Sequence, residues 1–173
     1  MGKRIIKEII SWILVFGIAI ILALLIERFV IFQVQVPTGS MENTIMTGDK
    51  VVTFRLSYLF SDPKRGDIVV FPFPDNEKDD YIKRIIGIGG DIIEIKDGIL
   101  YINNEQVTED YLLEPMIEQD FGPIEVPDGC YFMMGDNRNT SKDSRVWDNK
   151  FVKKEKIKGK AILKYPNFKW LNK

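Results

Sequence analysis

An uncharged apolar run near the start of the chain limits what it can fold into more than any other feature. Residues 9–26 (IISWILVFGIAIILALLI) contain no charged side chain, and about 18 such residues are the minimum for a helix that crosses a bilayer. The apolar character continues to Phe32, so the helix can span with some tilt. We therefore predict a transmembrane helix over residues 9–30, preceded by a short N-terminal segment of residues 1–8.

The alternatives to a retained anchor are a cleaved secretory signal peptide and a buried core helix. Signal-peptide cores usually contain about 7–15 apolar residues and end in a small-x-small cleavage site. Here the run is longer, and ERFVIFQVQV follows it without such a site, which favours the anchor. Because Lys3, Arg4 and Lys7 precede the run, the positive-inside rule predicts a single-pass protein of the cell membrane, with a cytoplasmic N-terminus and an extracytoplasmic domain over residues 31–173.

Residue types that are missing or rare exclude several kinds of site. The 173 residues include no histidine, which excludes a Ser-His-Asp triad, a Cys-His pair and a His-ligated zinc site. The one cysteine, Cys130, excludes an internal disulfide and a cysteine-cluster metal site, and on its apolar segment it is typical of a core residue. We predict no metal and no cofactor, so a nucleophile must be activated by a carboxylate, a lysine or a phenol.

Charge is distributed unevenly along the chain. Basic residues predominate before residue 30 and again in residues 150–173, and acidic residues predominate between them. Basic ends around an acidic body indicate contact with an anionic membrane surface rather than with nucleic acid. The lysine-rich C-terminal segment, with Tyr165, Phe168, Trp170 and Leu171, either rests on lipid headgroups or is a solvated tail.

Beyond the apolar run, the helical period gives way to short β-type segments. QVQVP (33–37) alternates apolar and polar residues, as a half-buried strand does. EIKDGILYINNEQV (94–107) holds the turn signals Asp97-Gly98 and Asn103-Asn104, which predict consecutive hairpins. We predict a mainly β fold, an antiparallel sheet domain preceded by one N-terminal transmembrane helix. Further strands are expected at 49–54, 66–73, 81–88, 91–95, 99–102 and 130–134, and loops at 74–80 and 114–122.

A hydroxyl-rich stretch, VPTGSMENTI, follows the apolar run almost directly and contains Ser40. A serine hydroxyl needs an adjacent base, and with histidine absent a neutral lysine is the best remaining candidate. A free lysine has a pKa of about 10.4, which burial can lower by up to about 3–5 units. DYIKRIIGIGGD (80–91) places Lys83 on an apolar strand. Since Lys83 and Arg84 are adjacent, we expect one to point into the protein and the other outward.

Each of these signals alone has a simpler interpretation. Ser40 fits a turn or helix cap, and Lys83 fits a solvated strand lysine. The third stretch, MGDNRNTSKDSR (134–145), fits a surface loop, but its paired charges and hydroxyl groups can also form a network that fixes a neighbouring ammonium. The combination of the three stretches is what points to a site.

Together the three stretches resemble the bacterial type I signal peptidases, the membrane-bound Ser-Lys proteases of the export pathway. GSMENT is similar to the family's serine box, GDIVVF to the strand that follows, YIKRIIGIGGD to its lysine box and GDNRNTSKDSR to its last box, in the same order. The resemblance covers about residues 30–165 and the preceding anchor. It implies an endopeptidase, anchored in the lipid bilayer and close to the export translocon, that cleaves the signal peptides of secretory preproteins after small-x-small (Ala-x-Ala) sites.

The resemblance also implies roles for individual residues. Ser40 matches the nucleophile, Lys83 matches the general base, and the Thr38 hydroxyl matches the group that joins the Ser40 amide in an oxyanion hole. The residues that match the dyad support are Ser141, Asp143 and Arg145. An extended substrate is expected to pair with the two strands that carry Gln35, Val36, Pro37, Tyr81 and Ile82.

Two departures from the family pattern stand out. Asn43 occupies a position where the family commonly has proline, which predicts a looser serine turn. The interval between Lys83 and Gly135 is short, which predicts one catalytic β-core with little or no second domain.

Two kinds of rival function remain open. One is another Ser-Lys enzyme, either an acyltransferase or a self-cleaving repressor. Penicillin-recognising enzymes place the lysine three residues after the serine, where this chain has Asn43, and self-cleaving repressors are cytosolic proteins with a DNA-binding domain. The other rival is a membrane-tethered β-domain that only binds a partner.

Overall fold

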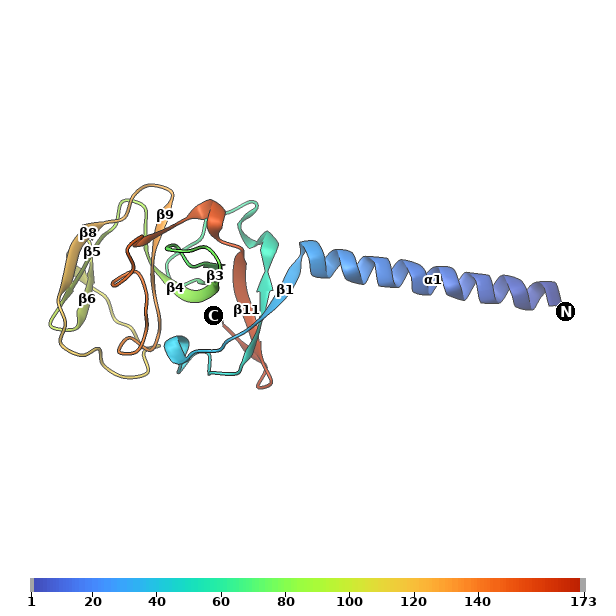
Figure 1. Ribbon diagram of the computed structural model, residues 1–173, viewed down its shortest axis with the longest axis horizontal. Helices are drawn as coiled ribbons and strands as arrows, with labels where there is room; N and C mark the ends of the chain where they lie inside the picture. The colour runs from blue at the N-terminus through green and yellow to red at the C-terminus, as the bar shows by residue number, and fades with distance from the viewer. Residues whose placement is uncertain (1, 172–173) are drawn as a thin grey trace.

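The computed structural model describes residues 2–171, and only the backbone of residues 2 and 3. Helix α1 (Gly2–Phe29) extends away from a β-domain that contains the rest of the described chain (Figure 1). Its side chains are exposed from Arg4 to Phe29, and this segment is long and apolar enough to cross a membrane. The side chain of Lys3, used above to orient the chain, and Lys173 lie outside the described part.

The main sheet is antiparallel throughout, as the alternating segments predict. Its strands follow the order β1-β2-β11-β3-β4-β9-β10, and β12 pairs with β11. Strand β1 therefore lies at one end of the sheet with an unpaired edge. The strands are β1 (Ile31–Gln35), β2 (Lys50–Phe54), β3 (Ile68–Pro72), β4 (Asp80–Ile88), β9 (Cys130–Met134), β10 (Phe151–Lys153), β11 (Gly159–Tyr165) and β12 (Lys169–Trp170).

A second, four-stranded sheet lies at the end of the domain away from α1 (Figure 1). Its order is β7-β6-β5-β8, and the two predicted turns carry positive φ angles at Asp97-Gly98 and Asn103-Asn104. The short interval between Lys83 and Gly135, where little or no second domain was expected, forms a sheet of its own. The expected loops at 74–80 and 114–122 are each wrong at the end, since Asp80 belongs to β4 and residues 121–122 belong to β8. The strands are β5 (Ile92–Lys96), β6 (Ile99–Ile102), β7 (Glu105–Gln106) and β8 (Phe121–Glu125).

The lysine-rich segment near the C-terminus is not a tail. It supplies β11, which lies between β2 and β3 in the main sheet. Lys160 pairs with Asp67, and Lys164 pairs with Asp49, so partly buried carboxylates neutralise lysines that the sequence pattern assigned to solvent or lipid. Both C-terminal interpretations are therefore wrong for residues 159–165 and for Leu171, which is buried in the core.

The core consists of buried apolar clusters on the faces of the sheets. One cluster includes Met41 and Ile45, both fully buried, which pack with Val51 and Ile68 of strands β2 and β3. These two side chains fasten the loop that follows β1 to the body of the sheet. Met133 and Met134 on β9 are fully buried, and Cys130 is half-buried on the same strand. Three short 3-10 turns complete the fold: η1 (Gly39–Met41), η2 (Arg55–Tyr58) and η3 (Lys154–Lys156).

Candidate active site

Ser40 lies in the 3-10 turn η1, directly after the edge strand β1, and its side chain is buried to all but 7%. Met41 anchors the turn in the core. The backbone N–H of Asn137 donates to the Ser40 carbonyl oxygen at 3.1 Å, and the Asn137 side-chain amide donates to the Gly39 carbonyl oxygen at 3.1 Å. The backbone on both sides of the Ser40 hydroxyl is therefore held in place.

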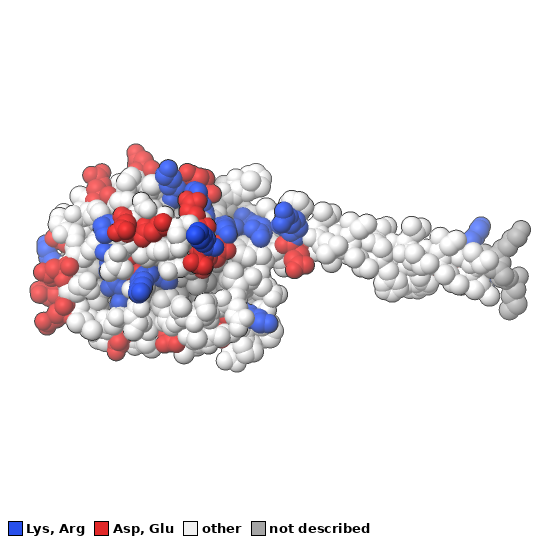
Figure 2. Space-filling view, viewed as in Figure 1, with Lys and Arg blue, Asp and Glu red and all other residues white. Residues whose placement is uncertain are grey.

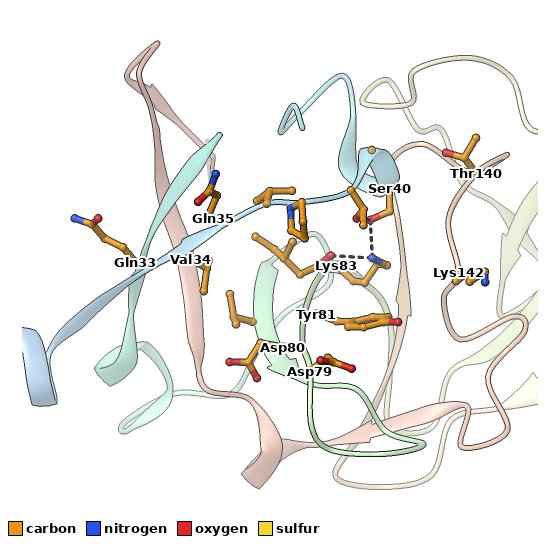
Figure 3. A pocket seen from close by; sticks show the side chains of 16 residues that line it. Gln33, Val34, Gln35, Ser40, Asp79, Asp80, Tyr81, Lys83, Thr140 and Lys142 are labelled. Carbon is orange, nitrogen blue, oxygen red and sulfur yellow. Dashed lines mark hydrogen bonds between the residues drawn. The ribbon is translucent and has the colours of Figure 1, made fainter. Parts of the chain in front are cut away.

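Lys83 on β4 reaches the Ser40 hydroxyl directly. The Lys83 Nζ lies 2.7 Å from Ser40 Oγ and 3.1 Å from the Ile82 carbonyl oxygen, and only 3% of Lys83 is exposed (Figure 3). The ring of Tyr81 lies beneath the ammonium, with 5.2 Å between Nζ and the ring centroid. Strand β4 is paired on both edges, by β3 and β9, which removes water from this part of the sheet.

Burial changes the protonation of Lys83. Removing the ammonium from water lowers the pKa of Lys83 from 10.5 to about 8, although the nearby carboxylates of Asp143 and Asp136 act in the opposite direction. About half of the molecules then carry a neutral amine at pH 8. A neutral amine at 2.7 Å can accept the proton of the Ser40 hydroxyl.

The predicted oxyanion-hole residue lies beside the nucleophile. Thr38 Oγ1 is 3.5 Å from Ser40 Oγ, and both residues line the same cavity. The N-terminal N–H groups of a short helical turn have no partner within the turn, and Ser40 occupies such a position in η1. A hydroxyl and an amide can therefore point toward one developing negative charge.

The last box is a buried ion-pair network behind the lysine. Asp143 accepts hydrogen bonds from Arg145 Nε at 2.8 Å, from Arg145 Nη2 at 2.9 Å and from the Gly135 amide at 3.1 Å. Ser141 Oγ is buried and, within residues 2–171, has no hydrogen-bond partner. A Cβ atom at Gly135 would collide with Ser141 Oγ and with the Ser40 carbonyl oxygen, so only glycine fits between them.

Arg84 does not point to solvent, so the expectation of one outward residue at Lys83 and Arg84 is wrong. Arg84 is 8% exposed and donates to both carboxylate oxygens of Asp136, at 2.8 Å and 2.6 Å. Its guanidinium lies 4.0 Å from the centroid of the Tyr111 ring. The two side chains do leave the strand on opposite faces, but both faces are covered.

Residues 109–113 cover the second face, and sequence reasoning missed this segment. Glu109 forms an ion pair with Arg138, with N–O distances of 2.5 Å and 2.6 Å. The Asn43 side-chain amide donates to the carbonyl oxygens of Tyr111 and Leu112, each at 3.0 Å. Asn43 has a φ of 83°, a left-handed conformation that asparagine tolerates. The predicted loosening of the serine turn is therefore wrong: Asn43 ties the turn to segment 109–113.

A cavity of about 870 Å³ opens onto Ser40 and Lys83, between β1 and β4 (Figure 3). All five residues predicted to bind an extended substrate line it: Gln35, Val36, Pro37, Tyr81 and Ile82. Ser141, Asp143 and Arg145 do not line it. Lining residues that the sequence did not single out are Gln33, Val34, Val70, Asp79, Asp80, Thr140 and Lys142. Among the described residues, no group of three or more acidic, Cys or His side chains is placed to hold a metal ion.

The sequence matches the family model described as signal peptidase, peptidase S26, over residues 9–166. The chain belongs to this family. A probable signal peptidase I-2 of Synechocystis is 40% identical over 152 residues, which are 85% of this chain and 68% of that protein. A signal peptidase I S of Bacillus subtilis is 39% identical over 171 residues, which are 92% of this chain and 91% of that protein.

Among solved structures, the crystal structure of a signal peptidase I from Enterococcus faecalis is similar, with a TM-score of 0.51 and 37% identity; the match covers 58% of this chain and 97% of that one. The comparisons confirm the bacterial type I signal peptidase family and a serine-type peptidase. Members of this family cleave signal peptides from preproteins. The mainly antiparallel β fold with one N-terminal apolar helix is confirmed as well.

Proposed function

We propose that this chain is a membrane-bound endopeptidase in which neutral Lys83 activates Ser40 to cleave signal peptides from exported preproteins. The 2.7 Å contact between Lys83 Nζ and Ser40 Oγ, two residues that are both buried, is the observation that carries the proposal. With no histidine in the chain, the amine is the group within reach that can accept the serine proton.

The reaction begins when neutral Lys83 takes the Ser40 proton as Ser40 Oγ attacks the scissile carbonyl carbon. The Ser40 amide and the Thr38 hydroxyl stabilise the oxyanion, and the loss of one such donor costs on the order of 3 kcal/mol. The tetrahedral intermediate collapses as protonated Lys83 gives its proton to the leaving amine, which frees the mature chain. Water then attacks the acyl-enzyme with Lys83 again as the base, and Ser40 is regenerated.

The last box supports this chemistry without touching the substrate. Asp143, held by Arg145, keeps negative charge near the Lys83 ammonium that forms in each half-reaction. Ser141, with an unpartnered hydroxyl beside Gly135, is a second candidate to orient the lysine. These roles follow from the resemblance and from the charges around Lys83.

The substrate binds as an extended segment between β1 and β4. The unpaired edge of β1 can accept a further strand through backbone hydrogen bonds, and the cavity there is lined by the five residues predicted from the two strands. The specificity for Ala-x-Ala is proposed from the family and from the cleavage-site pattern of signal peptides.

Helix α1 determines where the active site lies relative to the membrane. The visible face of α1 carries charged groups only near its two ends (Figure 2), as a membrane-spanning segment does. We propose that the N-terminus is cytoplasmic, that the β-domain lies outside the cell membrane, and that Ser40, shortly after α1, works close to the bilayer surface. A signal peptide has its own apolar core in the same bilayer, so its cleavage site emerges near Ser40 and near the translocon that delivers it.

The test is cleavage of a preprotein by detergent-solubilised protein, with native chain, Ser40→Ala, Lys83→Ala and the control Lys153→Ala. Lys153 is an exposed lysine of β10 that does not line the cavity. We expect native and control proteins to release the mature chain, and both active-site variants to lose at least a thousandfold in rate. A native rate in either active-site variant would refute the assigned roles. A native chain that binds preprotein without cutting it would support the tethered binding domain instead.

A further inference from the structure

Three charged side chains that line the cavity have no part in the proposed reaction: Lys142, Asp79 and Asp80. Lys142 lines the cavity together with Thr140 and the Ser40–Lys83 pair, and it is exposed. Across residues 2–171, its ammonium has no hydrogen bond or ion pair. Of the two carboxylates, Asp80 pairs with Lys158 at 2.7 Å, and Asp79 accepts a hydrogen bond from the Asn76 side-chain amide at 3.5 Å. Lys142 thus offers an unpaired positive charge to whatever occupies the cavity.

The backbone that carries Lys142 is fixed although the side chain is free. Its neighbours are Ser141, whose hydroxyl is buried, and Asp143, which is held by Arg145 and the Gly135 amide. A charge on a fixed backbone loses less entropy when it pairs with a ligand than a charge on a mobile loop does. The position is therefore suited to recognition.

The position of Lys142 relative to the scissile bond follows from the position of α1. Figure 3 shows the cavity with Gln33, Val34 and Gln35 on one side of Ser40, where the chain enters from α1, and with Thr140 and Lys142 on the other side. This step rests on the proposed function: a signal peptide whose apolar core lies in the bilayer beside α1 approaches along the Gln33 side. Residues that precede the scissile bond then lie along β1, and residues that follow it leave past Thr140 and Lys142.

We propose that Lys142 recognises an acidic side chain at one of the first two positions after the scissile bond, so that the enzyme prefers preproteins whose mature chains begin with Asp or Glu. An ammonium on a long, flexible stem can reach a carboxylate at either position. Such an exposed ion pair is typically worth about 0.2–1 kcal/mol, which corresponds to a preference of roughly 1.4-fold to 5-fold. Lys142 is a specificity-determining residue and has no role in the proton transfers.

The test compares two peptides that differ only in the first two residues after the cleavage site, Asp-Asp against Asn-Asn. The ratio of kcat/KM for the acidic over the amide peptide is measured for native protein, Lys142→Gln, Lys142→Glu and the control Lys153→Gln. We expect a ratio of about 1.4–5 for native and control proteins, a ratio near 1 for Lys142→Gln, and a ratio below 1 for Lys142→Glu. Salt should reduce the native ratio, because exposed ion pairs are screened.

A binding experiment tests the role of Lys142 independently of the proposed cleavage reaction. Affinities of the same two peptides are measured for Ser40→Ala and for Ser40→Ala combined with Lys142→Gln, neither of which needs to cut. The role of Lys142 is supported if Ser40→Ala binds the acidic peptide more tightly and the double variant binds both peptides equally. This holds even if native protein cleaves neither peptide, a result that would refute only the proposed function. An equal preference with and without the Lys142 ammonium, or no preference in native protein, overturns the inference.

Discussion

Lys83 Nζ and Ser40 Oγ lie 2.7 Å apart although the two residues are 43 positions apart in the chain. Ser40 reaches this position from the edge strand β1, while Lys83 lies on β4 in the interior of the sheet. The two are brought together because the serine loop folds back over the sheet and is fixed there by Met41 and by Asn137. The resulting pair is buried, and burial is what lowers the pKa of the amine.

Burying Lys83, which lowers its pKa, should reduce the stability of the folded protein. The pKa of Lys83 is about 8 in the folded protein against 10.5 in the unfolded chain, so the unfolded chain binds more protons between these values and stability rises with pH in this interval. Replacing the amine by an apolar group removes the penalty, and we expect Lys83→Met to raise Tm at pH 7, by roughly 2–4 °C for each kcal/mol removed.

The gain from Lys83→Met should shrink as pH rises from 8 to 10.5, because both states then lose the proton. Thermal unfolding at pH 7 and at pH 10 measures this gain in Tm, with Lys153→Met as a control in which an exposed lysine is replaced. A Tm for Lys83→Met that is lower than native at pH 7 would contradict the account of the buried amine.

Thr38 should matter to the rate more than to binding. Removing its hydroxyl in Thr38→Val takes one donor from the oxyanion, and we expect kcat to fall on the order of 100-fold, with a smaller change in KM. Thr38→Ser keeps the donor and should recover most of the rate. If Thr38→Val cleaves a signal peptide within twofold of native protein, the oxyanion hole must be built from other groups.

Asn43 should be a better residue at its position than proline. Asn43→Gly keeps the positive φ but loses two exposed hydrogen bonds, which we expect to cost about 1 kcal/mol of stability. Asn43→Pro should cost more, because the proline ring holds φ near −65° where the chain needs 83°.

We expect denaturant unfolding to show a free energy of unfolding that decreases from native protein to Asn43→Gly to Asn43→Pro. The rate of cleavage should decrease in the same order because the turn carries Ser40. An Asn43→Pro variant as stable and active as native protein would show that the serine turn does not depend on this conformation.

The sequence was sufficient for the elements with strong local signals. The apolar run, the alternating strands and the Asp97-Gly98 and Asn103-Asn104 turns each have a local physical cause, and the structure contains all of them. The proximity of Ser40 and Lys83 was predicted from the combination of three stretches, since neither residue is distinctive alone. Their chemical roles stay predictions.

The remaining features depend on tertiary context. Strand β11 is rich in lysine, and its place inside the sheet requires Asp67 and Asp49 to meet Lys160 and Lys164 from other strands. The covering of Arg84 similarly depends on segment 109–113, an irregular stretch with no periodic pattern. No local rule indicates such partners before the fold is known.

The pH dependence of kcat/KM for cleavage of an Ala-x-Ala preprotein tests the central claim most directly, because the fraction of neutral Lys83 sets the amount of active enzyme. The lowered pKa of Lys83, about 8, predicts that kcat/KM rises about tenfold per unit at low pH and levels off above an apparent pKa near 8. A profile that stays flat from pH 6 to pH 10 would show that the Lys83 amine is not the base that activates Ser40.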